Sequence, residues 1–362
     1  MPANSELKKA LEESTVPGIE QALGEVGRVR SAVLENGRAS AEIELGFPAD
    51  SVLRDLQQFF SEQAKAACGV EHADIVLSRK IAAHGVQPNL KPLENVSNII
   101  AIASGKGGVG KSTTAANLAL ALANDGASVG VLDADIYGPS QPLMLGLSGQ
   151  RPTSEDGKTM NPLTAHGLQV MSIGFLIDAD QPMVWRGPMV TQALNQLLQQ
   201  TRWSDLDYLI VDMPPGTGDI QLTLSQRVPV SGAVIVTTPQ DIALLDARKG
   251  LQMFRKVSVQ VLGIVENMST HVCSNCGFEE PVFGSGGGER MASDFGVKLL
   301  GQLPLDLRIR EQTDSGTPTV KADPESPAAQ AYMQCARRMA ARLAMQGRDY
   351  SRRFPNIVVE DS

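Results

Sequence analysis

Short apolar runs alternate with longer stretches of helical periodicity over residues 98–347. Most of the short runs are rich in β-branched residues without polar alternation, as is typical of strands buried on both faces of a parallel sheet. Strands are predicted at 99–102, 129–132, 209–211, 232–238, 261–265 and 299–303. Helices are predicted at 115–122, 241–257 and 327–345. This alternation predicts an α/β fold with a mainly parallel sheet flanked by helices.

The first 82 residues follow a different pattern, which predicts a small α+β domain at 1–82. Two strand-like segments flank a turn at Asn36-Gly37, as in a β-hairpin. The predicted elements are strands 29–34 and 41–45, helix 52–67 and strand 73–77. Residues 83–97 have the glycine, proline and polar composition of a linker. We expect the larger domain at 98–347 and a polar tail at 348–362.

A glycine-rich loop separates the first strand of the larger domain from its first helix. Gly105 and Gly110 have the spacing of a phosphate-binding loop and are followed by Lys111 and Ser112. In such a loop, backbone N–H groups bind phosphate oxygens, the lysine neutralises the β- and γ-phosphates, and the serine hydroxyl ligates Mg²⁺. The residues predicted to bind ATP here are Gly105, Lys106, Gly107, Gly108, Val109, Gly110, Lys111, Ser112 and Thr113. A chance glycine-rich turn is the alternative, but it does not require a strand before it and a helix after it.

Aspartates follow two of the predicted buried strands. Asp133 and Asp135 come after the strand at 129–132, and Asp212 closes the strand at 209–211. Ligands bind at the carboxyl ends of parallel strands, so these carboxylates are expected beside the phosphate loop. An apolar strand that ends in aspartate is typical of a Mg²⁺-holding residue, which favours Asp212, with Asp133 also near the metal. The alternative is that these carboxylates only solvate the strand ends.

The segment after Asp212 is predicted to be a switch. It reads Met-Pro-Pro-Gly-Thr-Gly-Asp over residues 213–219. Gly216 in this segment is expected to offer its backbone N–H to the γ-phosphate and to move on hydrolysis.

The cysteines are few, but two of them are closely spaced. Four cysteines are too few for a disulfide framework in a chain of 362 residues. Cys273 and Cys276 are separated by two residues, which lets both thiolates face one metal. Zn²⁺ and [4Fe-4S] sites both usually take four ligands, so a second copy of the chain would complete either. The residues alone leave a cluster, zinc, a redox disulfide and an inert thiol pair open.

Charge and hydropathy limit the classes of partner. The formal net charge of −8 argues against a nucleic-acid surface, which needs clustered Lys and Arg. No uninterrupted apolar run reaches the ~18 residues of a membrane span, and the N-terminus lacks an apolar signal segment. We therefore expect a cytoplasmic protein without nucleic-acid or membrane partners.

Five segments together resemble the Mrp/ApbC family of iron-sulfur cluster carrier ATPases, within the MinD, ParA, ArsA and nitrogenase iron protein group. They are 104–113, 133–140, 185–189, 212–219 and the cysteine pair, and the resemblance spans roughly residues 99–345. The second lysine of the loop, Lys106, matches the deviant Walker A motif of that group. The resemblance implies an ATP-hydrolysing homodimer. Such a dimer would bridge a labile [4Fe-4S] cluster through Cys273 and Cys276 of both subunits and pass it to apo-proteins, with cluster assembly factors as further partners.

The resemblance also implies roles for single residues. Lys106 would reach the partner subunit's phosphates, in the way an arginine finger does, and Asp135 would help activate the attacking water. Asn267 would lie against the adenine ring, where its amide can donate and accept at once. The N-terminal domain resembles the MIP18-like domain, although many of its members carry Pro-Ala-Cys where this chain has Pro-Ala-Asp at 48–50.

Three rival functions remain open. A MinD- or ParA-like positioning ATPase would need a membrane-binding tail or a basic face, and the acidic chain end with the net charge of −8 shows no clear sign of either. A zinc-bridged ATPase would use the same thiolate pair. A reductase like the nitrogenase iron protein would need a stable, reversibly reducible cluster.

Overall fold

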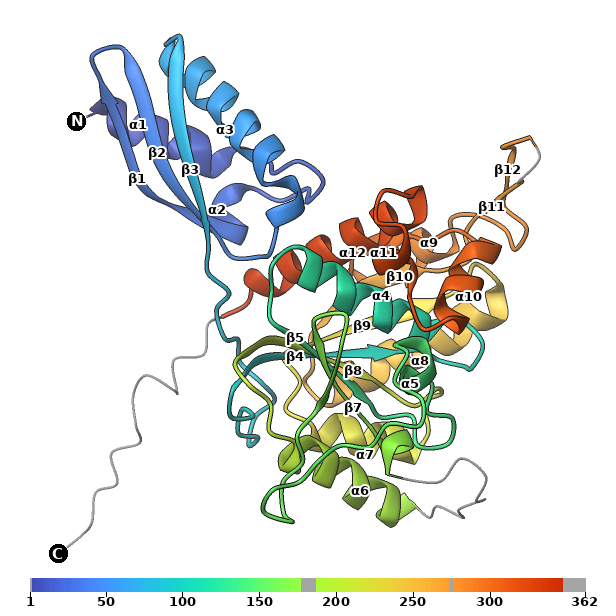
Figure 1. Ribbon diagram of the computed structural model, residues 1–362. Coiled ribbons are helices and arrows are strands. Elements are labelled where there is room, and N and C mark those ends of the chain that lie inside the picture. Colours follow the sequence, from blue (N-terminus) through green and yellow to red (C-terminus); the bar gives the residue numbers. More distant parts are fainter. Residues whose placement is uncertain (1, 177–186, 274–275, 348–362) are drawn as a thin grey trace, which may run out of the picture.

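The computed structural model describes residues 2–176, 187–273 and 276–347. An eight-stranded sheet forms the centre of the larger domain (Figure 1). Its strand order is β13 (Leu299–Gln302), β10 (Val261–Glu266), β9 (Gly232–Thr237), β4 (Val96–Ala103), β8 (Leu206–Asp212), β5 (Val129–Asp133), β7 (Leu168–Ser172) and β6 (Leu163–Ala165). Neighbouring strands are parallel except β6 and β7. The predicted α/β fold with a mainly parallel sheet is confirmed.

Helices cover both faces of this sheet (Figure 1). On one face α4 (Lys111–Asn124) packs against α12 (Pro327–Ala344), and on the other α6 (Gly187–Gln200) packs against α7 (Asp219–Arg227). All residues from Ala115 to Leu122 in α4 are buried, because this alanine- and leucine-rich helix lies between the sheet and α12. The remaining helices are α5 (Gln141–Met144), α8 (Asp241–Lys256), α9 (Gly287–Phe295), α10 (Leu307–Asp314), α11 (Thr319–Ala322) and the 3₁₀ turn Ile173–Phe175. No helix of the described ranges is long and apolar enough to cross a membrane.

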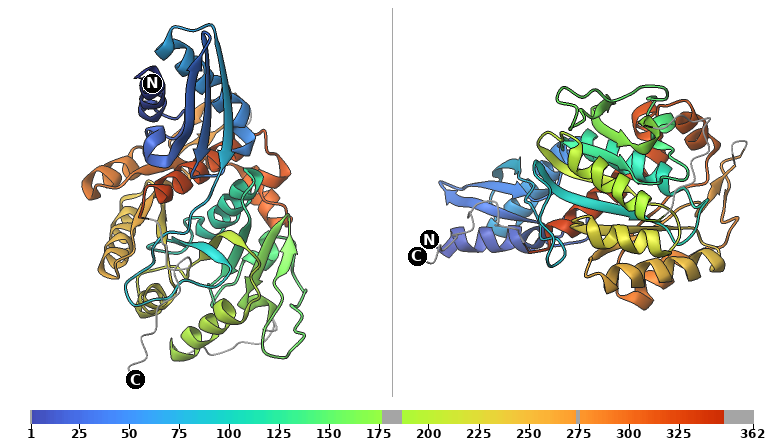
Figure 2. Two further views of the ribbon diagram at one scale, coloured as in Figure 1. Left: turned by 90° about the vertical axis from the view of Figure 1, so that its left-hand side faces the viewer. Right: turned by 90° about the horizontal axis from the view of Figure 1, so that it is seen from below.

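The first 79 residues form a separate three-stranded sheet with helices on one side (Figure 2). Antiparallel β1 (Gly27–Glu35) and β2 (Arg38–Leu45) form the predicted hairpin, and β3 (His72–Arg79) pairs in parallel with β2. Asn36 and Gly37 both have positive φ, as the turn requires. The helices are α1 (Pro2–Glu13), α2 (Leu23–Val26) and α3 (Leu53–Cys68). The 3₁₀ turn Asp50–Val52 directly precedes α3. We refer to this unit as the small domain.

The segment that connects the two domains is anchored to the larger one. The buried Gln87 side chain donates from Nε2 to the carbonyl oxygens of Ser225 and Val228, at 2.8 and 3.0 Å. Its Oε1 accepts from the backbone N–H of Val230 at 2.9 Å. The backbone N–H of His84 donates to Asn98 Oδ1 at 3.1 Å. The segment between β3 and β4 is therefore packed against the larger domain rather than free, and β4 begins at Val96, so the last two residues of the predicted linker belong to this strand.

The small domain docks on the carboxyl end of α4 (Figure 1). The backbone N–H and the hydroxyl of Ser51 both donate to Asp125 Oδ1. Arg79 Nη1 pairs with Asp50 and donates to the Asp125 carbonyl oxygen at 3.0 Å. Gly126 has φ +90°, and a Cβ there would collide with Asp50 and Arg79 side-chain atoms. Only glycine therefore fits between the two domains at this point.

Helix α12 contributes the rest of this contact. Arg337 Nε lies 3.1 Å from Oδ2 of Asp125. The next residue of the helix, Arg338, donates to the Gly18 carbonyl oxygen at 2.8 Å and pairs with Glu20 at 2.7 Å. We call the contact set of Asp50, Ser51, Arg79, Asp125, Gly126 and Arg337 the interdomain joint.

Candidate nucleotide site and cysteine hairpin

The phosphate loop connects β4 to the amino end of α4, and its glycines fall into two groups. A Cβ on Gly105 would collide with the backbone of α8 at Asp246, and a Cβ on Gly110 would collide with the Asn267 amide. By contrast, nothing lies within 4 Å of a Cβ built on Gly107 or Gly108. The first pair is needed for packing of the loop, and the second pair leaves its outer side open to a phosphate.

Lys111 and Asp212 meet at the bottom of this loop. Both side chains are buried, and Lys111 Nζ pairs with Asp212 Oδ1 and lies 3.1 Å from the Ser112 hydroxyl oxygen. Gln141 completes the cluster, because its Nε2 donates to Asp212 Oδ2 at 2.9 Å and to the Ser112 carbonyl oxygen at 3.0 Å. The structure thus brings together three predicted site residues and one, Gln141, that the sequence did not reveal.

Asp133 lies next to this cluster, but its carboxylate is occupied by donors. Ser140 N, Gln141 N and the Ser172 hydroxyl donate to Oδ2 at 3.0–3.1 Å, and Asp135 N donates to Oδ1 at 3.2 Å. Burial, and after it the neighbouring Asp212 carboxylate, raise the pKa of Asp133 to about 7. In this structure Asp133 fixes the loop after β5.

Asp135 is partly buried at the same sheet edge. Burial raises the pKa of its carboxyl group, and the positive charge of Lys111 opposes that rise. A carboxylate with a raised pKa beside a phosphate loop can accept a proton from water. The predicted water-activating role of Asp135 is therefore compatible with its position, and it stays a prediction.

Two further predicted residues pack against the loop. Asn267 Nδ2 donates to the Val109 carbonyl oxygen at 2.9 Å, which places the amide on the side of the loop away from Lys111's partner Asp212. Gly216 has φ +99°, and its N–H donates to the Ser104 carbonyl oxygen at 3.0 Å. Both residues therefore contact the loop directly, through bonds that a bound nucleotide would have to share or replace.

Lys106 lies at the outer side of the loop. Lys106 is half-buried, and its carbonyl oxygen accepts a hydrogen bond from the Ser104 hydroxyl at 2.9 Å. No ion pair of its ammonium group is found within the described ranges. The predicted role of Lys106 at a partner's phosphates stays a prediction.

The cysteine pair lies on a hairpin that projects from the body (Figure 1). The hairpin is formed by β11 (His271–Val272) and β12 (Glu279–Glu280), and it places Cys273 half-buried and Cys276 exposed. Cys273 N donates to the Phe278 carbonyl oxygen at 2.9 Å, and Gly277, with φ +71°, donates to the Cys273 carbonyl oxygen at 2.8 Å. Within the described residues no three His, Cys, Asp or Glu side chains gather as a metal site. The hairpin of one chain therefore offers two thiolates to a metal site.

Exposed apolar side chains lie on the hairpin and on segments that follow the strand ends at the sheet edge of the phosphate loop. They follow the carboxyl ends of β5, β9, β10 and β13, which all lie at one edge of a parallel sheet. They are Tyr137, Leu143, Ile242, Leu245, Val272, Phe278, Val282, Phe283 and Leu307. A concentration of large apolar groups at one edge is typical of a surface that another protein covers.

Some residues singled out in the sequence are not part of the phosphate-loop cluster or of the cysteine pair. Trp185 and Arg186, in the segment 185–189 that contributed to the resemblance, lie outside the described residues. His271 is half-buried, and its Nδ1 lies 3.1 Å from the Leu305 carbonyl oxygen. Cys335 is buried in α12 against Gly301, and burial raises the pKa of its thiol to about 12.

Comparison with known proteins identifies the family of this chain. Residues 95–340 match the sequence model of a ParA-type family described as NUBPL iron-transfer P-loop NTPase. The chain is 62% identical over 269 residues to an iron-sulfur cluster carrier protein of Pseudomonas fragi, covering 74% of this chain and 94% of that protein. It is 57% identical over 306 residues to the iron-sulfur cluster carrier protein of Escherichia coli, covering 84% and 83% of the two chains.

A solved structure supports the same conclusion. The chain is similar to a nucleotide-binding protein from Archaeoglobus fulgidus in complex with ADP, with a TM-score of 0.57 and 36% identity. The match covers 66% of this chain and 92% of that one. The resemblance predicted from the five sequence segments is confirmed, and the chain belongs to the NUBPL iron-transfer family of ParA-type P-loop NTPases.

Proposed function

We propose that this chain is an ATP-hydrolysing homodimer of the cytoplasm that holds a [4Fe-4S] cluster as cargo and delivers it to apo-proteins. The observation that carries the proposal is the position of the cysteine hairpin. It offers two thiolates, follows β10 at the same sheet edge as the phosphate loop, and projects from the body (Figure 1). Two such hairpins, from two copies, supply the four thiolates that one [4Fe-4S] cluster takes. The names of the relatives, iron-sulfur cluster carrier proteins, support the same cargo.

The exposed apolar side chains support a dimer built on this edge. They lie on the hairpin and at the sheet edge of the phosphate loop, so a second copy that covers them brings two hairpins together. The same contact places Lys106 of each copy near the other copy's phosphates, where it would stabilise charge in the transition state.

Within one copy, ATP would change the partners of Lys111. The ammonium group now pairs with Asp212, and the nucleotide's phosphates would draw it away from that carboxylate. The oxygens of Ser112 and Asp212 are the hard ligands that Mg²⁺ prefers, so these residues fit a Mg²⁺ that neutralises phosphate charge. Asn267 would lie against the adenine, Gly216 would contact the γ-phosphate, and Asp135 would orient the attacking water. Because Asp212 leads directly into residues 213–219, movement there would reach the neighbouring strand ends.

The cargo is tested by its composition. Iron, acid-labile sulfide and zinc are measured per chain on protein purified and reconstituted without oxygen, for the wild type and for Cys273→Ser with Cys276→Ser. The matched control replaces the two other thiols, Cys68→Ser with Cys335→Ala, which lie in α3 and α12 and not in the hairpin. We expect about two irons and two sulfides per chain in the wild type and in the control, and almost none in the hairpin double variant.

Two results would redirect the proposal. Zinc at about half an atom per chain, without sulfide, would make the protein a zinc-bridged ATPase. Retention on liposomes or DNA that depends on ATP would instead support a positioning ATPase of the MinD or ParA kind.

A further inference from the structure

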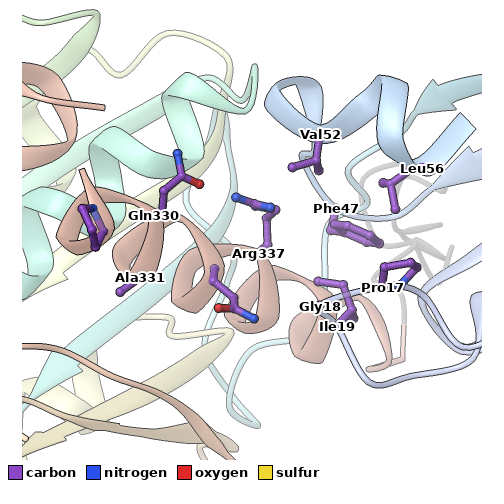
Figure 3. Close-up of a pocket in the computed structure, with 11 residues that line it drawn as sticks. Pro17, Gly18, Ile19, Phe47, Val52, Leu56, Gln330, Ala331 and Arg337 are labelled. Carbon is purple, nitrogen blue, oxygen red and sulfur yellow. The ribbon is translucent and has the colours of Figure 1, made fainter. Parts of the chain in front are cut away.

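A cavity of about 300 Å³ lies between the small domain and α12, on the opposite side of α12 from the sheet (Figure 3). Its two walls differ in character. Phe47, Val52 and Leu56 form an apolar wall on the small domain, and Gln330 and Arg337 face them from α12. Cavities of this size between two domains, with a few polar groups among apolar ones, are typical ligand sites.

Arg337 gives this cavity its chemistry. Its side chain is 13% exposed, and Nε lies 3.1 Å from Asp125 Oδ2 in the interdomain joint. Nε itself makes no hydrogen bond, and no hydrogen bond of the two terminal nitrogens, Nη1 and Nη2, is found within the described residues. Figure 3 shows the guanidinium group between α12 and the wall of Phe47 and Val52. The Nε side of the group therefore faces Asp125 as an ion pair, and Nη1 and Nη2 offer a planar pair of donors to the cavity that Arg337 lines.

We propose that the cavity binds a small carboxylate with an apolar body. A carboxylate matches the two-donor edge of Arg337 with two parallel, charge-assisted hydrogen bonds. The apolar body would lie against Phe47, Val52 and Leu56, where its burial is favourable. A phosphate group fits less well, because its remaining charged oxygens would face that apolar wall without partners.

Occupation of the cavity is linked to docking of the small domain. The apolar wall and the Arg337 edge belong to different domains, so both contact the ligand only when the domains are docked. A ligand that binds one arrangement of a protein stabilises that arrangement. Bound carboxylate therefore favours the closed joint, and it slows hydrogen exchange of the Ser51 amide that donates to Asp125.

The test uses the full-length protein and hexanoate, with 1-hexanol as the uncharged counterpart. Binding is followed by ligand-detected NMR and calorimetry. Arg337→Lys keeps a positive charge beside Asp125 but removes the planar donor pair. Arg342→Lys is the matched control, because it lies on the same helix but does not line the cavity. Val52→Asp leaves Arg337 unchanged and places a charge in the apolar wall, against the ligand's apolar body.

We expect hexanoate to bind the wild type and Arg342→Lys equally, and about tenfold more weakly to Arg337→Lys and to Val52→Asp. Hexanol should bind much more weakly than hexanoate, and hexanoate should slow exchange of the Ser51 amide. Equal binding of hexanoate by Arg337→Lys, equal binding of hexanol, or absence of saturable hexanoate binding by the wild type would each overturn the proposal. Unchanged Ser51 exchange at saturating hexanoate would overturn the link to docking.

Discussion

The two ends of α4 are built for opposite purposes. At the amino end, Lys111 and the open glycines of the phosphate loop leave helix N–H groups available to an anion. At the carboxyl end, the orphan carbonyl groups are satisfied by protein, since Asp125 N donates to Ala121 O and Ala127 N donates to Leu122 O. The Asp125 carbonyl itself accepts from Arg79 of the small domain.

The difference shows how one helix serves two partners. A helix has a positive amino end and a negative carboxyl end, so a phosphate is favoured at the first and a cation at the second. Accordingly, Arg79 and Arg337 both lie at the carboxyl end. Asp125 places a carboxylate at the negative, carboxyl end of α4, which is unfavourable for a negative charge. Burial raises the pKa of its carboxyl group, although the Ser51 donors and the Arg337 charge lower it, so the surrounding donors only partly offset its burial.

The largest effect is expected at the amino end, from Lys111→Ala. The change removes the charge that neutralises the β- and γ-phosphates, so ATP hydrolysis should fall about a hundredfold or more. Steady-state phosphate release measures the rate of ATP hydrolysis.

Lys106→Ala is the comparison variant within the same loop. If Lys106 acts on a partner's nucleotide, this second variant should slow turnover but keep the affinity for a non-hydrolysable ATP analogue. Normal hydrolysis by Lys111→Ala would show that the loop is not the catalytic one.

At the carboxyl end, Gly126→Ala should disrupt the joint. The new Cβ collides with Asp50 and Arg79, and its φ of +90° is unfavourable for alanine, so the free energy of unfolding should fall by about 2–4 kcal/mol. Chemical denaturation measures the loss, and limited proteolysis near residue 80 reports undocking. Gly149→Ala is matched for φ, at +77°, but has nothing within 4 Å of its Cβ, so it should lose only about 1 kcal/mol. Equal losses in the two variants would mean that backbone strain alone, and not the collision, accounts for the effect.

At the amino end of α4, Gln141→Leu should have a smaller effect on stability and on hydrolysis. The near-isosteric leucine leaves buried Asp212 Oδ2 without its donor, which should lower the free energy of unfolding by about 2 kcal/mol and slow hydrolysis several-fold. Gln169→Leu is the control, because it also removes a side chain with two hydrogen bonds, to Ser204, but at an exposed site. A loss in Gln169→Leu as large as that in Gln141→Leu would argue against a special role for burial beside the phosphate loop.

The smallest effect is expected from Asp50→Asn at the joint. Asp50 is half-exposed, and Arg79 keeps its hydrogen bond to the Asp125 carbonyl, so the loss of the ion pair should cost under about 1 kcal/mol. Unfolding is compared at low and high salt, and the difference between variant and wild type should shrink at high salt because exposed charges are screened. A loss above about 2 kcal/mol that does not change with salt would place Asp50 among the main supports of the joint.

Sequence patterns predicted the elements whose periodicity is strong. The buried strands β4, β5, β8, β9 and β10, the hairpin at Asn36-Gly37, and helices α3, α8 and α12 all lie within a few residues of their predicted ranges. Helix α1 was not predicted, and neither were β6, β7 and α6, because their short or mixed patterns resemble loops. The loop residues Gly105, Gly110, Lys111 and Ser112 could be found from spacing alone.

Other parts of the site could not be predicted, because they depend on single polar residues with distant partners. Gln141 meets Asp212, and Gln87 meets Val230, across 71 and 143 residues of sequence. Nothing in the local pattern distinguishes these glutamines from surface ones. The same holds for Asp125, which looks like an ordinary helix stop until the small domain is placed beside it. The packed segment 83–97 and the interdomain joint therefore required the structure.

The joint also has a consequence for how the chain is made. The small domain is complete by Arg79, whereas its docking partner Arg338 lies in the last described helix. At the ~5–20 residues per second of protein synthesis, the nascent small domain spends on the order of ten seconds or more without α12. During that time Phe47 and Leu56 face water or a chaperone instead of the finished cavity. The small domain can therefore complete its docking only after α12 has been synthesised.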